Sequence, residues 1–172
     1  MKPTILSFFL FVSAVAHGAE PASVAFKPVA TVLDRIMQRE PGYDRIPKTA
    51  FWNLYGQNDT SAYLHHDGKG LATGAFLQFG IAHDKRRDQH YQQCLPIAKY
   101  LIATLLPNLK MSIADIDSNL QTARTEKRVL RFNDGERVIF FRYKFSEPED
   151  KDTYACYRIE IGGKDLQVST DK

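Results

Sequence analysis

The sequence predicts an α+β protein: an antiparallel C-terminal meander, with helices packed on one side of it and one disulfide joining the two layers. Three observations lead to this fold class. Apolar residues recur at helical spacing through the middle of the chain. Alternating strand-like segments flank an Asn133-Asp134-Gly135 turn in the last third. The only two cysteines, Cys94 and Cys156, fall one in each of these parts.

The first nineteen residues have the layout of a secretory signal peptide. Met1-Lys2 is positively charged, Ile5 to Val15 is apolar, and small residues up to Ala19 offer cleavage after positions 16, 18 or 19. The apolar run is shorter than the roughly 20 residues that span a bilayer. We therefore expect a signal peptide at 1–19 and a periplasmic or secreted domain at 20–172 without stable membrane insertion. A retained N-terminal anchor is the alternative.

The cysteine count fits export. In an oxidising compartment a lone pair of cysteines predicts one disulfide, here Cys94 to Cys156. Closing a loop of roughly 60 residues would stabilise the fold by about 4 kcal/mol and would remove both thiols as nucleophiles. A cysteine-dependent enzyme is therefore not expected.

Three helices and a glycine-rich hairpin are predicted before the meander. A helix is predicted from Pro28 to the Pro41-Gly42 stop. Short strands at Tyr63-Leu64 and Ala75–Phe79 follow, after an aromatic segment and a turn at 56–59. A long helix then runs from about residue 84 or 88 to 106, either kinked or restarted at Pro96, and Ser112 caps a further helix.

The meander is predicted as strands at 128–132, 137–145 and 153–161, with a break at Gly162-Gly163 before a last strand at 166–168. Alternation places Cys156 on the same face as Arg158 and away from Tyr157. A disulfide to Cys94 then requires the long helix to cross near that end of the strand, or a bulge to re-aim the cysteine.

Histidines are the first candidates for chemistry. His65 and His66 lie in a glycine-flanked segment beside Lys69, and His83 and His90 precede or begin the long helix. Convergence of two histidines with a lysine would allow acid–base cleavage of a phosphodiester. The spacing matches no compact metal motif. We therefore expect no metal site and no cofactor, and a polar loop is the plainer interpretation.

Two charged surfaces suit binding better. The first is a basic stripe on the outer sheet face, formed by Arg142, Lys144 and Arg158. Arg131 and Arg137 are expected near it. The second is the acidic hairpin tip made by Glu147, Glu149, Asp150 and Asp152. Each also has a plain interpretation, as a solvated, charge-protected sheet face and as a soluble turn. The aromatic group Phe51, Trp52 and Tyr55 is expected to pack in the core.

Chemistry and composition together favour a non-catalytic binding protein. No nucleophile elbow, phosphate-binding loop or dinucleotide fingerprint is present. Without Lys2, 22 basic residues face 20 acidic ones, so no nucleic-acid partner is expected. We expect a protein partner and an inhibitor or immunity protein for a periplasmic hydrolase or toxin. A histidine-dependent hydrolase or nuclease and a structural or accessory envelope subunit are the alternatives.

Overall fold

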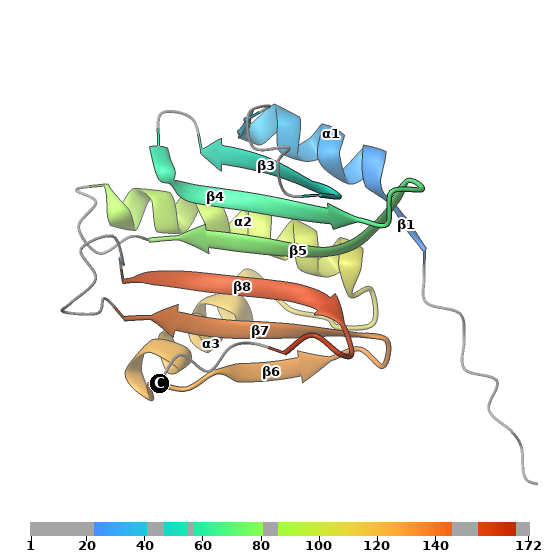
Figure 1. Cartoon of the computed structure of the whole chain (residues 1–172). Coiled ribbons are helices and arrows are strands. Elements are labelled where there is room, and N and C mark those ends of the chain that lie inside the picture. Colours follow the sequence, from blue (N-terminus) through green and yellow to red (C-terminus); the bar gives the residue numbers. More distant parts are fainter. Residues whose placement is uncertain (1–22, 41–46, 55–56, 81–85, 146–154, 168–172) are drawn as a thin grey trace, which may run out of the picture.

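A computed structural model describes residues 23–40, 47–54, 57–80, 86–145 and 155–167 of the chain. It contains three helices and eight strands in these ranges (Figure 1). Their bounds, in chain order, are β1 Val24–Ala25, α1 Phe26–Ile36, β2 Gln38–Arg39, β3 Thr49–Leu54, β4 Gln57–His66, β5 Leu71–Phe79, α2 Arg87–Leu105, α3 Ile113–Thr125, β6 Leu130–Asn133, β7 Arg137–Lys144 and β8 Cys156–Gly163. The predicted α+β class is confirmed.

All eight strands belong to one antiparallel sheet. Its order is β2-β3-β4-β5-β8-β7-β6, and β1 pairs separately with β5. The N-terminal hairpin and the C-terminal meander are joined by the pairing of β5 with β8, in which Ala75 faces Ile161 and Phe79 faces Tyr157. Sequence analysis predicted the two halves but not that they share one sheet.

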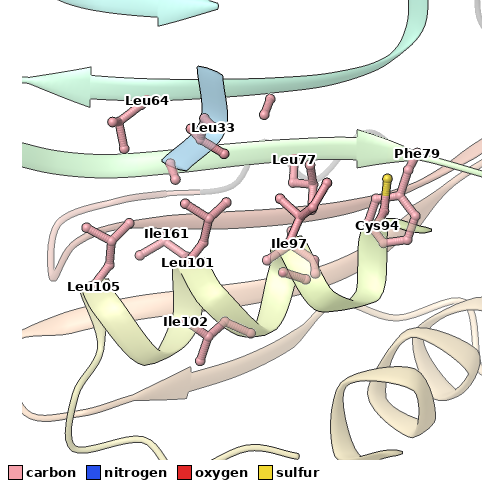
Figure 2. Packing of buried hydrophobic residues seen from close by; sticks show 14 of the residues in the cluster. Leu33, Leu64, Leu77, Phe79, Cys94, Ile97, Leu101, Ile102, Leu105 and Ile161 are labelled. Atoms are coloured by element: carbon pink, nitrogen blue, oxygen red, sulfur yellow. The ribbon is translucent and has the colours of Figure 1, made fainter. Parts of the chain in front are cut away.

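The helices cover one face of the sheet. Alternate strand residues such as Trp52, Leu77 and Ile159 share a single buried cluster with Leu33 of α1 and Leu101 of α2. Figure 2 shows the side chains of α2 directed at the strands, and Figure 1 shows α2 and α3 behind them. Burial of this one face stabilises the sheet, because alternation gives the longer strands an apolar side.

Local sequence explains where α3 begins. Ser112 caps α3, since its hydroxyl accepts a hydrogen bond from the Asp115 N–H while the Asp115 carboxylate accepts one from the Ser112 N–H. These hydrogen bonds hold the pKa of Asp115 below its usual value. α2 is one helix that runs through Pro96 rather than restarting there.

Several predicted boundaries are wrong. Residues 57–59 open β4 instead of forming a turn. Gly162 and Gly163 do not break the strand but end it in register with Val138 and Arg137. Residues 166 and 167 follow a turn and lie outside any strand, and residue 168 lies outside the described residues.

The predicted disulfide is also wrong, because Cys94 and Cys156 are both free and buried. Cys94 points from α2 into the core beside Phe79 (Figure 2). Cys156 lies on β8 one residue before the core residue Tyr157, so its side chain projects from the other face. The sheet itself separates the two thiols. The alternation predicted for Cys156 was therefore correct, and its pairing was not.

No helix in the described part of the chain is long and apolar enough to cross a bilayer.

Candidate functional site

The face of the sheet turned away from the three helices is the candidate site, and we call it the open face. None of the described helices packs on it, and its residues are absent from the shared core cluster. Its central residues are Thr49, Phe51, Asn53, Ser61, Tyr63, His65, Gly74, Phe76, Gln78, Arg131, Phe140, Arg142, Lys144, Cys156, Arg158, Glu160 and Gly162.

An aromatic row crosses half of the open face. Phe51, Tyr63 and Phe76 lie opposite one another on β3, β4 and β5. Their ring centroids are 4.5 Å apart for the first pair and 5.4 Å for the second. Cross-strand aromatic contacts of this kind stabilise a sheet and fix the rings in place. Phe51 is only 5% exposed, so Tyr63 and Phe76 are the rings of this rigid row that reach the surface.

Arginines border this aromatic row. The Arg158 guanidinium lies 5.6 Å from the Phe76 ring centroid, and its Nε donates a hydrogen bond to the Gln78 side chain at 3.0 Å. On β7, the Arg142 Nη2 lies 2.7 Å from a carboxylate oxygen of Glu160, and both side chains are at most 15% exposed. These contacts hold the charged groups in fixed positions before any partner arrives.

The predicted basic stripe is thus brought together in the structure. Arg142 lies directly across from Arg158, and Lys144 lies across from Cys156. Two like charges opposite one another on neighbouring strands are unfavourable, and within the described part of the chain Glu160 pairs with one of them, Arg142. Burial raises the pKa of Cys156, an effect that the three nearby cations reduce. The thiol stays protonated and is a poor nucleophile.

A small pocket of about 280 Å³ lies at one end of the open face. Gly74 and Gly162 form its base, and His65, Phe76 and Glu160 form part of its wall. A Cβ on Gly74 would clash with the carbonyl oxygen of Ile161, and one on Gly162 would lie 2.9 Å from the Leu166 side chain. Glycine at both positions therefore allows the close approach of these neighbouring groups at the pocket.

One acceptor on the open face lacks a donor. Asn53 is 7% exposed, and its Oδ1 receives no hydrogen bond within the described part of the protein. Most buried acceptors in proteins receive a hydrogen bond, so Asn53 Oδ1 is an exception at this edge of the face.

Other predicted site residues fall elsewhere. Glu147, Glu149, Asp150 and Asp152 of the acidic tip, and Tyr55, lie outside the described residues. Arg137 belongs to the helix side, where its guanidinium donates to the carbonyls of Leu105 and Ala72 at 2.9 and 3.1 Å. It holds the end of α2 against β5 and is not part of the basic stripe. Trp52 is fully buried in the core, as expected.

The described histidines are dispersed. His65 and His66 end β4, with His65 on the open face near Thr49 and His66 against Phe26 on the helix side. His90 lines a different pocket beside Leu54, near the start of β4. The ten residues of β4 separate these ends by roughly 30 Å. His83 lies outside the described residues.

The described residues contain no group of three or more His, Cys, Asp or Glu side chains that could hold a metal ion. The Cys94 thiol is also unsuited to catalysis, since burial raises its pKa to about 12.

Sequence analysis found the arginines of this face but missed its aromatic row. Phe51 was grouped with its neighbour Trp52, although alternation puts them on opposite faces. The period of two was available in the sequence, but the pairing that aligns Phe51, Tyr63 and Phe76 was not. No protein-family model matches this chain, and no curated protein or solved structure is significantly similar to it.

Proposed function

We propose that the chain is an exported, non-catalytic binding protein that holds one protein partner on its open face. The partner would be a periplasmic hydrolase or toxin, and this chain its inhibitor or immunity protein. One observation carries the proposal: a sheet face not covered by the described helices presents a rigid aromatic row bordered by arginines.

The composition of this face resembles that of protein interfaces. Aromatic residues and arginine are enriched at binding hot spots, where they are buried at the centre of the contact. Here the side chains are already fixed by neighbours on the same sheet, as the Arg158 contacts show. Fixed side chains lose little entropy on association, so less of the contact energy is lost in ordering the surface.

The charge of the face indicates the partner's chemistry. Arg131, Arg142, Lys144 and Arg158 outnumber Glu160 among its central residues. A complementary partner surface carries carboxylates around an apolar centre. The same cations would meet an anionic polymer, but an aromatic row of this width suits the apolar centre of a protein interface better.

Site-specific photocrosslinking in the source cells tests the proposal. A photoreactive phenylalanine replaces Phe76, at the centre of the open face, and in a matched variant it replaces Lys99, which is exposed on α2. We expect the position-76 probe to capture one protein in stoichiometric amount and the position-99 probe to leave it uncaptured. The captured protein must be an enzyme or toxin whose activity falls when this chain is added.

Three results would overturn the proposal. They are no adduct at position 76, equal capture of the same protein from both positions, and adducts only between copies of this chain. The last would favour a structural subunit of the envelope. Substrate turnover by the purified chain that is abolished by His65→Ala or His90→Ala would favour the histidine-dependent hydrolase.

A further inference from the structure

The small pocket at one end of the open face lies over three strands. His65 comes from β4, Gly74 and Phe76 come from β5, and Glu160 and Gly162 come from β8. Its volume of about 280 Å³ is at the lower limit of small-molecule sites. An apolar cavity of about 150 Å³ already holds benzene. The pocket therefore has room for one large side chain of a partner.

The floor of the pocket is bare backbone. Side chains at Gly74 and Gly162 are excluded by the carbonyl oxygen of Ile161 and by the Leu166 side chain, so the fold itself keeps the floor free of them. Glycines inside strands are typical of places where another group approaches the backbone closely. Phe76 and Leu166 add apolar walls. A flat ring fits between these walls and the floor.

One carboxylate oxygen of Glu160 is available to a ligand. Glu160 Oε1 is shut off from solvent and lies 2.7 Å from Arg142 Nη2. Glu160 Oε2 is not shut off from solvent and accepts no hydrogen bond from the described residues. A carboxylate has about four acceptor positions, so the ion pair leaves capacity for a further donor. A ligand with an O–H or N–H at this point gains a hydrogen bond that the fold does not make.

The charges around the pocket favour a neutral occupant. Arg142 already balances the Glu160 carboxylate, and Arg158 lies two positions along β8 on the same face. An added ammonium or guanidinium group would be repelled by these arginines, and an added carboxylate would be repelled by Glu160. A neutral donor avoids both costs and still forms the hydrogen bond.

His65 narrows the choice of donor. Its Nδ1 lies 3.0 Å from the Thr49 hydroxyl, and its Nε2 has no hydrogen-bond partner among the described residues. Burial lowers the pKa of this imidazole below 6.5, so the ring is neutral at pH 7. Its Nε2 then donates or accepts, depending on the tautomer. A phenol hydroxyl can do either in return, whereas an indole N–H can only donate.

We propose that this pocket receives one tyrosine side chain of the partner, with its ring on the glycine floor and its hydroxyl between Glu160 and His65. The proposal rests on the function proposed above, in which a protein partner covers the open face, and it adds the chemistry of one anchor. Tyrosine is enriched among the residues that contribute most of the energy of protein interfaces, where such residues fill pockets.

The chemistry of the pocket can be measured without the partner. The probe p-cresol is the tyrosine side chain as a free molecule, and p-methylanisole is the same ring with its hydroxyl methylated. Butylammonium and propionate represent lysine and glutamate. Titration of the isotope-labelled chain with each probe, followed by the amide NMR signals of Gly74 and Gly162, measures binding. We expect p-cresol to bind at least fivefold more tightly than the other three. No shifts with p-cresol, equal binding of p-methylanisole, or tighter binding of either ion would overturn the proposal.

Two exposed residues of β5 give a matched pair of variants. Thr73 lines the pocket, and Leu71, two positions before it, does not. Thr73→Trp should fill the pocket, abolish the p-cresol shifts and weaken inhibition of the captured partner at least tenfold. Leu71→Trp should change neither. A partner that is inhibited equally by Thr73→Trp and the wild type would overturn this proposal alone. Failure to capture any partner at position 76 would overturn the proposed function, and this proposal with it, even where p-cresol binds.

Discussion

His65 lies near the end of β4 and is half-buried, with its Nδ1 3.0 Å from the Thr49 hydroxyl. Burial lowers the pKa of this imidazole below 6.5, and the neighbouring charge of His66 lowers it further. The unfolded chain therefore binds the proton more tightly than the folded chain does. The contribution of His65 to stability is complete above pH 6.5 and is lost as the pH falls toward the folded-state pKa.

The first prediction follows at the residue scale. The free energy of unfolding of the wild type should decrease as the pH is lowered from 7.5 to 5, and His65→Gln should show a smaller decrease over the same range. Urea unfolding at a series of pH values measures both. His66→Gln removes the smaller of the two causes of the lowered pKa and should therefore reduce the decrease less than His65→Gln does. Parallel curves for wild type and His65→Gln would show that His65 is not held neutral by the fold.

The cysteines show what single residues can and cannot reveal in a sequence. Alternation along β8 correctly placed Cys156 with Arg158, and that placement already opposed a bond to a helix on the other face. The rule that exported proteins pair their cysteines was given more weight, and it was wrong here. The prediction of export consequently depends on residues 1–19 alone.

At the element scale, a hydrogen-bonded cluster joins α2, α3 and β8 where the disulfide was expected to do so. The Tyr91 hydroxyl donates a hydrogen bond to the Asp117 carboxylate at 2.6 Å and accepts one from the side-chain amide of Gln121. The oxygen of the same amide accepts a hydrogen bond from the Tyr157 hydroxyl. The Tyr91 and Tyr157 rings lie 4.8 Å apart. Burial raises the pKa of Tyr91, so its phenol stays protonated and able to donate.

Tyr91→Phe should therefore lower the free energy of unfolding by about 1–2 kcal/mol, because Asp117 and Gln121 each lose a partner. Tyr100→Phe removes a hydroxyl from the same helix outside this cluster and should change stability by no more than about 0.5 kcal/mol. Denaturant unfolding compares the two variants. Equal losses would mean that the cluster does not join the helices to the sheet.

Element types were more predictable than element ends. The helix at α3 and its cap follow from local residues, since Ser112 and Asp115 lie within one turn. The end of β8 does not, because Gly162 and Gly163 remain in the strand through pairing with distant residues on β7. Local glycine preference for turns was outweighed by cross-strand hydrogen bonds that only the assembled sheet supplies.

At the scale of the whole molecule, the decisive contact is the pairing of β5 with β8. It joins Ala75 to Ile161, which are separated by half of the chain, and turns two separate hairpin systems into one sheet. Periodicity identifies each strand but carries no information on which distant strand becomes its neighbour. The open face depends on this pairing, because it brings Phe76 beside Glu160. The sequence therefore predicted residues of the candidate site without predicting the site.

On the proposed function, the open face inhibits a partner by direct contact. A titration of the captured partner's activity against the wild-type chain, Arg158→Glu and Lys110→Glu tests this. Arg158 lies on the open face, and Lys110 is an exposed residue between α2 and α3. We expect complete inhibition at one equivalent of wild type or Lys110→Glu, and an inhibition constant at least tenfold weaker for Arg158→Glu. Equal inhibition by all three proteins, or none by the wild type, would contradict the account.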